Sequence, residues 1–275
     1  MVVVDAALDR PYSVCMPLYS ARVLGNREIA RDYFQLDFEW PQAYPTPAPG
    51  QFFTIRVDPG PVPLLRRPFG FSTVSADGRA STIYWRRGQA TRAIAALQDG
   101  DVLDVLAPLG RGFPLPSSDS LPVLVAGGVG VGPILYLANA LSAHSPAPLL
   151  VVGARSAVSL PEIDIDPRVE VHLATDDGSH GYHGTAVALA QELIEQRSEH
   201  AELFLCGPHP MLAAGHRLAE EFSLTAWVAM EQMMGCAVGA CMGCAIPVHG
   251  EAEYARVCTE GPVFRTTKIA WERME

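Results

Sequence analysis

The stretch LPVLVAGGVGVGPILYLANALSA, residues 121–143, decides the class of fold for the second half of the chain. It begins with an apolar run of strand length, passes through a cluster of glycines and continues as an apolar segment of helical length. A buried strand that leads through a glycine loop into a helix is the repeating unit of a parallel α/β sheet. The stretch therefore predicts an α/β domain of the nucleotide-binding type, with ligands at the carboxyl ends of its strands.

The same region raises one alternative, because no Asp, Glu, Lys or Arg lies between Ser120 and Ala154. A segment of that length could span a bilayer. It contains a glycine cluster and several prolines, including Pro133, Pro146 and Pro148, which would break a single long helix. Two buried strands joined by a loop and a helix fit the pattern better, so no membrane span is expected.

Apolar strands and amphipathic helices continue to alternate along the chain. Further strands are expected at residues 147–155, 169–175 and 201–206, and helices at 184–196 and 211–222. This alternation is typical of a parallel sheet covered by helices.

The first part of the chain has a different pattern, with short runs of alternating apolar residues. These runs lie at residues 22–26, 33–38, 51–57 and 81–87, and turn-rich segments separate them. Strands at this spacing predict a small antiparallel barrel.

The two patterns divide the chain into three predicted domains. The barrel is assigned to residues 17–116, the parallel-sheet domain to residues 117–230, and a small cysteine-containing module to residues 231–275. The polar segment PSSDS at residues 116–120 forms the linker. The expected fold class is therefore a multidomain β-barrel plus α/β protein.

Composition restricts the partners. The 275 residues are 49% hydrophobic and carry a formal net charge of −10, which disfavours binding to nucleic acid or to anionic lipid. The N-terminal residues lack the basic segment and long apolar run of a signal peptide. We therefore expect a cytoplasmic protein with no nucleic-acid or membrane partner.

The segment MMGCAVGACMGC, residues 233–244, places three of the six cysteines within nine residues. Cys236, Cys241 and Cys244, with Cys258, have the spacing C-x4-C-x2-C-x13-C, which is typical of a plant-type [2Fe–2S] site. The small residues between them let backbone N–H groups approach a cluster and can adopt positive φ. Structural zinc is the alternative, although it favours two C-x2–4-C knuckles. Such clustering indicates metal ligation in a reducing compartment.

Other motifs are less specific. Arg66 and Arg67 could hold a pyrophosphate or could be solvated surface charges. A helix expected to start at Thr91 would offer free N–H groups to an anion. The glycines at residues 127–132 fit either a phosphate loop or tight strand–helix packing. Cys206, directly after a strand, is more typical of a packed apolar residue than of a nucleophile.

Together these blocks resemble a known family. RRPFGFS at residues 66–72, AGGVGVGP at 126–133, CGPHPM at 206–211, CAVGACMGC at 236–244 and VCTEGPVF at 257–264 are similar to the ferredoxin-reductase superfamily. The C-terminal block, the most specific of them, resembles the electron-transfer subunits of B-type dihydroorotate dehydrogenase. The glycine loop is shared by many reductases and is the least specific.

The resemblance implies FAD on the barrel, a [2Fe–2S] cluster on the four cysteines and NAD(H) at the α/β domain. It also implies a hetero-oligomer with a catalytic flavoprotein subunit that is dihydroorotate dehydrogenase-like and carries FMN. In this role the chain is an oxidoreductase subunit of pyrimidine biosynthesis, which passes electrons between the dihydroorotate-oxidising partner and NAD+. No catalytic acid or base is expected in this chain, and Glu231 is the only candidate near the flavin.

Two family motifs carry the site assignment. R-P-x-S falls on residues 67–70 with Gly70 in place of the serine, and Ser72 could compensate because it faces the same side of the strand. G-x-G-T falls on residues 88–91 with Ala90 in place of the second glycine. The expected cofactor-binding residues are Arg67, Pro68, Phe69, Gly70, Ser72, Ile83, Tyr84, Trp85, Gly88, Ala90, Thr91, Gly127, Gly128, Gly130, Gly132, Cys206, Gly207 and Pro208, with Cys236, Cys241, Cys244 and Cys258 as metal ligands.

Two other functions remain open at this stage. An NAD(P)H–ferredoxin reductase-type subunit of another redox complex, such as a hydrogenase or glutamate synthase, would use the same cofactors with a different partner. A zinc-stabilised nucleotide-binding regulator would be colourless. The sequence does not decide between NAD and NADP, because Arg155 and Ser156 could meet a 2′-phosphate or lie on the surface.

Overall fold

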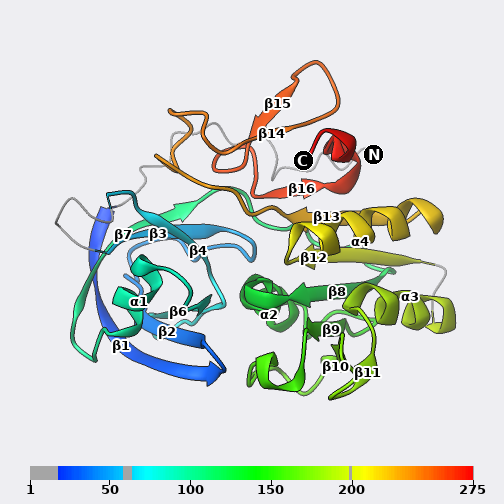
Figure 1. The fold of residues 1–275 in the computed structure, drawn as a ribbon, viewed down its shortest axis with the longest axis horizontal. Helices are drawn as coiled ribbons and strands as arrows, with labels where there is room; N and C mark the ends of the chain where they lie inside the picture. The colour runs from blue at the N-terminus through cyan, green and yellow to red at the C-terminus, as the bar shows by residue number, and fades with distance from the viewer. Residues whose placement is uncertain (1–17, 58–63, 198–199, 275) are drawn as a thin grey trace.

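The computed structural model describes residues 18–57, 64–197 and 200–274. Cys15 and the expected start of the barrel at residue 17 lie outside the described residues. Two seven-stranded sheets and one two-stranded sheet form the described part. Figure 1 shows the first sheet and the second sheet side by side, with the C-terminal segment lying across one edge of both.

The first sheet is antiparallel and has the order β4-β3-β7-β1-β2-β6-β5. Its edge strands β4 and β5 are neighbours in sequence, and the Thr82 hydroxyl donates to the carbonyl of Gly70 at 2.8 Å. This bond and the proximity of β4 to β6 bring the two ends of the sheet together, in line with the predicted barrel. Its strands are β1 (Leu18–Ala30), β2 (Tyr33–Glu39), β3 (Phe52–Arg56), β4 (Arg67–Gly70), β5 (Thr73–Val74), β6 (Arg79–Trp85) and β7 (Val102–Leu109).

Alternation along the strands fills the barrel. Phe34, Leu36 and Phe38 of β2 are buried at every second position, as a period of two requires for a strand with one face inward. They pack in one cluster with Phe53 of β3 and Tyr84 of β6.

Helix α1 (Gln89–Ala95) begins two residues before the expected start at Thr91, so that prediction was wrong. Gly88 is the N-cap, and Thr91 occupies the third helical position. The Thr91 hydroxyl reaches back to accept the Gly88 N–H at 3.0 Å. In the sequence, a threonine that caps the helix from its third position cannot be told from a threonine at the N-cap. The predicted helix start is therefore two residues too late.

The second sheet has the order β11-β10-β9-β8-β12-β13-β16. All its neighbours are parallel except β13 and β16, which are antiparallel. Its strands are β8 (Leu121–Gly127), β9 (Leu149–Ala154), β10 (Glu170–Thr175), β11 (Tyr182–His183), β12 (Ala201–Cys206), β13 (Thr225–Ala229) and β16 (Val263–Arg265). The helices are η1 (Gly128–Gly130), α2 (Val131–Ala140), η2 (Ala157–Ser159), α3 (Ala186–Arg197) and α4 (His209–Glu221).

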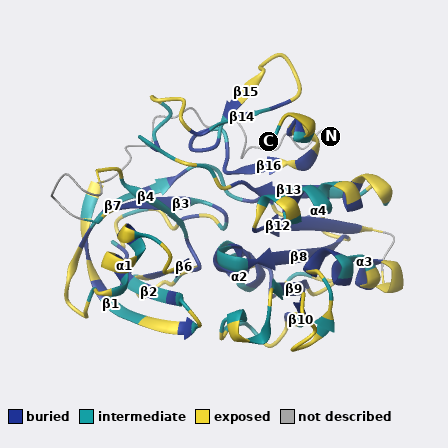
Figure 2. Ribbon diagram, in the orientation of Figure 1, coloured by how far each residue is buried: buried dark blue, intermediate teal, exposed yellow. Residues whose placement is uncertain are grey.

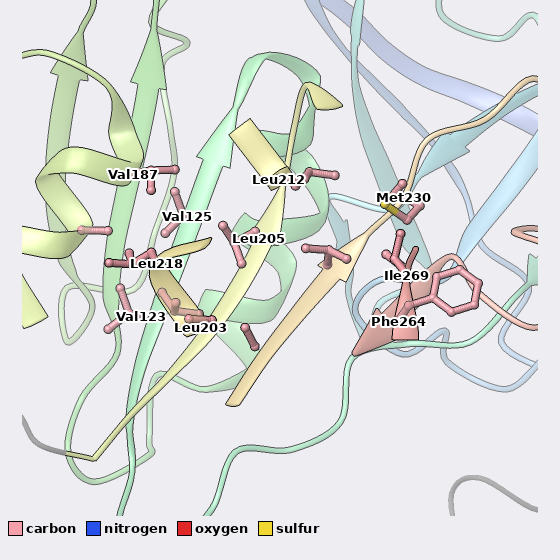
Figure 3. Packing of buried hydrophobic residues seen from close by; sticks show 14 of the residues in the cluster. Val123, Val125, Val187, Leu203, Leu205, Leu212, Leu218, Met230, Phe264 and Ile269 are labelled. Atoms are coloured by element: carbon pink, nitrogen blue, oxygen red, sulfur yellow. The ribbon is translucent and has the colours of Figure 1, made fainter. Parts of the chain in front are cut away.

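Successive residues of β8 face two different cores. Val123 and Val125 pack with residues of α3 and α4, and Figure 3 shows them near Leu205 of β12. Leu124 and Ala126 pack with α2 on the other side of the sheet. Figure 2 shows β8 and β12 buried along their length. Burial on both faces explains why this strand is apolar at every position.

The C-terminal segment packs against both larger parts of the molecule. Strands β14 (Ala245–Pro247) and β15 (Tyr254–Arg256) form a two-stranded sheet, and the turns η3 (Thr266–Lys268) and η4 (Trp271–Arg273) follow β16. Phe264 and Ile269 belong to the core of the second sheet, near Met230 (Figure 3). The predicted domain boundaries at residues 116 and 230 stay a prediction. Strand β16, from the predicted third domain, pairs with β13 of the second domain, so these two regions share one sheet.

The charge-free segment from Ser120 to Ala154 forms β8, η1, α2 and β9. Among the described residues, no helix is long and apolar enough to cross a membrane.

The burial of the second sheet gives a stability prediction. Leu205 is fully buried, so Leu205→Ala should lower the free energy of unfolding by about 2–5 kcal/mol because it leaves a cavity between β12 and α4. Leu115→Ala is the matched control, because this leucine is 82% exposed and its removal should change the value by at most about 0.5 kcal/mol. Urea unfolding followed by circular dichroism measures both; equal losses would contradict the assigned core.

Candidate functional site

A cavity of about 840 Å³ lies where the barrel, the carboxyl ends of the parallel strands and the C-terminal segment meet. Its size is that of a site for a cofactor rather than for a small ion. The barrel contributes Arg67, Pro68, Phe69, Gly70, Ile83, Tyr84, Trp85 and Thr91 from the predicted set, the sheet contributes Val129, Cys206 and Ala229, and the C-terminal segment contributes Glu231, Met233, Met234, Gly235 and Gly243.

A smaller pocket of about 300 Å³ adjoins this cavity and shares Arg67 and Thr91 with it. Gly88 and Ala90 line the smaller pocket, together with Arg87. Two guanidinium groups beside the first turn of α1 suit a pyrophosphate. The pair of pockets thus fits an extended cofactor with a planar ring at one end and a diphosphate beyond it.

The two neighbouring arginines have different surroundings. Arg66 is held by Asp104, with Nη2 donating to Oδ1 at 2.8 Å and Nη1 to the carbonyl at 3.1 Å. Among the described residues, Arg67 makes a hydrogen bond to the carbonyl of Leu65 and has no carboxylate partner. Arg66 therefore braces the strand, and Arg67 is the arginine available to an anion.

Close packing against Pro133 explains why position 70 is glycine, where the family motif has serine. A Cβ at Gly70 would lie 2.5 Å from Cγ of Pro133, so the proline ring of α2 occupies that space. Ser72 is buried outside the cavity lining, and its hydroxyl accepts the Ile83 N–H at 2.9 Å. A Cβ at Gly132 would lie 2.5 Å from the same hydroxyl. Ser72 therefore supports β6 and the α2 contact, and its expected compensation for the missing hydroxyl stays a prediction.

The glycine loop serves close packing between adjacent units of the sheet. A Cβ at Gly130 would lie 2.1 Å from the carbonyl oxygen of Cys206, and one at Gly127 would lie 2.7 Å from Sδ of Met211. Of this loop, Val129 lines the cavity. The geometry thus supports the packing interpretation for these two glycines.

The remaining predicted nucleotide residues lie at the same edge of the sheet. Gly128 has φ of +57°, and Tyr33 Oη would be 3.6 Å from its Cβ. Gly207 approaches Met211, whose Cε would be 2.6 Å from a Cβ there, and Pro208 is the N-cap of α4. The described structure therefore brings these residues to the carboxyl edge beside the cavity.

Tyr33 and Arg87 were not predicted from the sequence. The rings of Tyr33 and Trp85 are stacked with centroids 6.2 Å apart, and Arg87 lies over Trp85 at 4.9 Å from its centroid. Trp85 is thus held at the cavity edge by an aromatic ring and a guanidinium. The pairing of β2 with β6 places Tyr33 opposite Trp85. This contact depends on strand register, for which a single sequence carries little signal.

Glu231 and Cys206 share the cavity wall. Burial among protein atoms raises the pKa of Glu231, although its side chain still reaches the cavity space, and Arg87 partly offsets this effect. Burial likewise raises the pKa of the Cys206 thiol well above its usual range, and the charge of Glu231 adds to the effect. Cys206 is therefore a neutral packed thiol, in line with the packing interpretation.

Backbone N–H groups surround the sulfur atoms of the cysteine loop. Cys236 Sγ accepts from the N–H groups of Val238 at 3.5 Å, Ala240 at 3.3 Å and Cys241 at 3.4 Å. Burial by itself would raise the pKa of Cys236, but these donors and the Cys241 thiol together lower it to about 7. A loop that stabilises a thiolate in this way is suited to bind a metal.

The four cysteines form two pairs rather than one set. Cys236 Sγ accepts the Cys241 N–H at 3.4 Å, and Cys244 Sγ accepts the Cys258 N–H at 3.4 Å. Within residues 18–57, 64–197 and 200–274, no three His, Cys, Asp or Glu side chains are placed to hold one metal ion. A tetrahedral zinc site needs its four ligands around one point, whereas a [2Fe–2S] cluster takes two cysteines on each iron. The donor set therefore fits the cluster.

Positive φ angles shape the loop at unexpected positions. Gly239 has φ of +82°, as the sequence allowed, but Gly235 and Gly243 do not have positive φ. Ala237 and Met242 take φ of +60° and +59° instead. A positive φ is an energetically unfavourable backbone conformation for alanine or methionine. Residues with strained backbone angles of this kind concentrate at functional sites.

A flavin-sized cavity, a barrel joined to a parallel sheet and a paired cysteine loop define a flavin and iron–sulfur oxidoreductase of the ferredoxin-reductase type. Residues 231–270 match the family model described as the iron-sulfur cluster binding domain of dihydroorotate dehydrogenase B. A solved NADH-dependent reduced ferredoxin-NADP oxidoreductase, with TM-score 0.81 and 25% identity, covers 91% of this chain and is itself covered to 90%.

Two curated relatives extend the likeness over almost the whole chain. The dihydroorotate dehydrogenase B (NAD(+)) electron transfer subunit of Geobacillus kaustophilus (strain HTA426) is 39% identical over 90% of this chain and 96% of its own length. That of Desulforamulus reducens (strain ATCC BAA-1160 / DSM 100696 / MI-1) is 33% identical over 93% and 99%. The chain belongs to the family of electron transfer subunits of dihydroorotate dehydrogenase B.

The paired cysteines predict the outcome of single substitutions. Cys236→Ser should remove bound iron and the visible absorption of the cluster, because one iron loses half of its protein ligands. Cys206→Ser, which changes a buried thiol outside the loop, should keep both. Iron and acid-labile sulfide per chain measure the difference. Normal iron content with Cys236→Ser would contradict the assignment.

The two pockets predict which arginine binds the cofactor. Loss of a charged hydrogen bond costs about 1.5–3 kcal/mol, so Arg67→Ala should weaken FAD binding about 10- to 100-fold. Arg92→Ala is the control, because this exposed arginine of α1 lies outside both pockets. Fluorescence titration of the flavin-free protein measures both affinities, and equal values would refute the assignment.

Proposed function

We propose that this chain passes electrons between a dihydroorotate-oxidising partner subunit and NAD+, through a [2Fe–2S] cluster and FAD. One observation carries the proposal: the cysteine loop forms part of the wall of the flavin-sized cavity, through Gly235 and Gly243. The printed names of the relatives, electron transfer subunits of an NAD(+)-dependent dihydroorotate dehydrogenase, supply the donor and the acceptor.

The proposed FAD site uses both pockets. Arg67 and residues 88–91 would hold the diphosphate, and Phe69, Tyr84 and Trp85 would border the ring. When bound, FAD supplies the ability to exchange electrons singly or in pairs, which neither a nicotinamide nor an iron–sulfur cluster can do by itself. The chain's own residues bind and orient; none is assigned a catalytic acid or base.

The proposed NAD(H) site lies at the carboxyl ends of β8, β12 and β13. Val129, Cys206 and Ala229 at these ends line the same cavity as the flavin residues. Ligands of parallel sheets bind at this edge. A nicotinamide bound there would reach the flavin ring directly, and the apolar thiol of Cys206 would help to exclude water from the hydride path.

The reaction balances across the two subunits. On the partner, dihydroorotate loses two electrons and two protons to become orotate. The two electrons cross to this chain one at a time, and NAD+ takes up both with one proton to become NADH. The second proton passes to solvent. The cysteine loop therefore serves one-electron transfer, and the edge of the parallel sheet serves hydride transfer.

The assembly follows from this division of chemistry. We infer a hetero-oligomer with a dihydroorotate dehydrogenase-like, FMN-containing subunit, in which the three proposed domains carry FAD, NAD(H) and the cluster. A cytoplasmic location is proposed because a thiolate-ligated cluster requires a reducing compartment.

Activity of the assembled complex tests the proposal. Dihydroorotate should reduce NAD+ only when both subunits are present. In the same complex, Cys236→Ser should abolish this reaction and retain NADH oxidation by ferricyanide, since Cys236 lines neither pocket of the proposed FAD site. An isolated chain that reduces ferredoxin rapidly and does not associate with a dihydroorotate-oxidising subunit would contradict the proposal and favour the ferredoxin reductase alternative.

A further inference from the structure

Two glycines beside the cluster-binding cysteines belong to the wall of the flavin-sized cavity. Gly235 and Gly243 both line the cavity. A Cβ at Gly235 would lie 3.2 Å from Cys241 Sγ, and a Cβ at Gly243 would lie 3.5 Å from it. The sulfur of Cys241 therefore lies close to two residues of the cavity wall, although Cys241 itself does not line the cavity.

A hydrogen bond adds to this contact. The Gly243 N–H donates to Cys241 Sγ at 3.5 Å. By comparison, Cys236 Sγ accepts from residues outside the cavity lining, and Cys244 Sγ accepts the Cys258 N–H at 3.4 Å. Cys241 is thus the ligand whose sulfur lies near both wall glycines and accepts a hydrogen bond from one of them.

Backbone conformation does not explain why these two positions are glycine. Neither Gly235 nor Gly243 has a positive φ, so an L-residue could adopt either conformation. The constraint on these two positions is steric, because a side chain would occupy space next to the Cys241 sulfur. At Gly235 the Cβ would press on the Cys241 sulfur more tightly than ordinary contacts allow, and at Gly243 it would make an ordinary contact.

We propose that Gly235 and Gly243 are positioning residues that hold the Cys241 ligand against the flavin site, and that electrons pass between cluster and flavin through Cys241 Sγ. This inference rests on the proposed function. At each passage one centre loses one electron and the other gains it, and no bond at sulfur forms or breaks. Two passages supply the electron pair that NAD+ takes up as hydride.

The exposure of Cys241 suggests an alternative role in electron transfer to the partner subunit. Cys241 is the exposed member of the four cysteines, and the nearby Met233 and Met242 are 85% and 51% exposed. If Cys241 instead serves the exchange with the partner subunit, a change at Gly235 would slow transfer to the partner and leave the exchange with the flavin unchanged.

The test compares Gly235→Ala and Gly243→Ala with Gly25→Ala. Gly25 is the matched control, because its Cβ would also make an ordinary contact, 3.4 Å from Asp37, without a positive φ and outside the cavity lining. Iron, FAD and the EPR spectrum of the reduced cluster establish that each full-length variant is loaded. Anaerobic rapid mixing with NADH then follows flavin bleaching and cluster reduction separately.

We expect NADH to bleach the flavin at the wild-type rate in Gly25→Ala, and the rate of cluster reduction in each variant is expressed relative to flavin bleaching in the same variant, because Gly235 and Gly243 also line the flavin cavity. Cluster reduction should be several-fold slower in Gly235→Ala, less affected in Gly243→Ala and normal in Gly25→Ala. Gly235→Ala should also shift the EPR spectrum, since its methyl group presses on a ligand sulfur. Should Gly235→Ala fail to bind the cluster, Gly243→Ala decides by itself.

Wild-type rates of cluster reduction in the loaded Gly235→Ala and Gly243→Ala proteins would overturn the inference and leave the proposed function intact. Failure of NADH to reduce the cluster in the wild-type chain would instead refute the proposed function. The two failures are therefore distinguishable.

Discussion

The structure depends on how one peptide, Gly261–Pro262, is held between three parts of the chain. The Gly261 carbonyl accepts the Arg111 N–H from the end of the barrel at 2.7 Å, and the Pro262 carbonyl accepts the Met230 N–H from the end of β13 at 2.8 Å. A Cβ at Gly110 would lie 2.5 Å from Pro262, so the segments can meet only with glycine there. Because this contact leads directly into β16, it places the cysteine loop against the cavity.

Glycines in this chain have three different structural roles, and sequence patterns do not distinguish between these roles. Gly130 permits close packing of backbone on backbone, Gly239 supplies a positive φ, and Gly235 leaves room for a sulfur atom. A glycine-rich stretch beside a strand therefore does not by itself identify a phosphate loop. The function of each glycine follows from what a Cβ would touch.

Local patterns predicted much of the fold. The bounds of β8 follow from a continuous apolar run, those of β12 from an apolar run interrupted only by Glu202, and the cysteine spacing indicates the cluster directly. Contacts between distant segments were not predictable in the same way. The β13–β16 pairing and the stack of Tyr33 on Trp85 arise from tertiary register, and the role of Ser72 follows from its bond to Ile83. The start of α1 was misplaced because Thr91 caps from inside the helix.

The central claim is that one chain holds a two-electron centre and a one-electron centre in direct exchange. Anaerobic titration of the purified, cofactor-loaded chain with NADH, followed by visible absorption and EPR, tests it most directly. The account predicts that flavin and cluster are both reduced without the partner subunit, with an uptake of about three electrons per chain, two on FAD and one on the [2Fe–2S] cluster. A colourless protein with stoichiometric zinc, or a flavin that bleaches beside a permanently oxidised cluster, would contradict it.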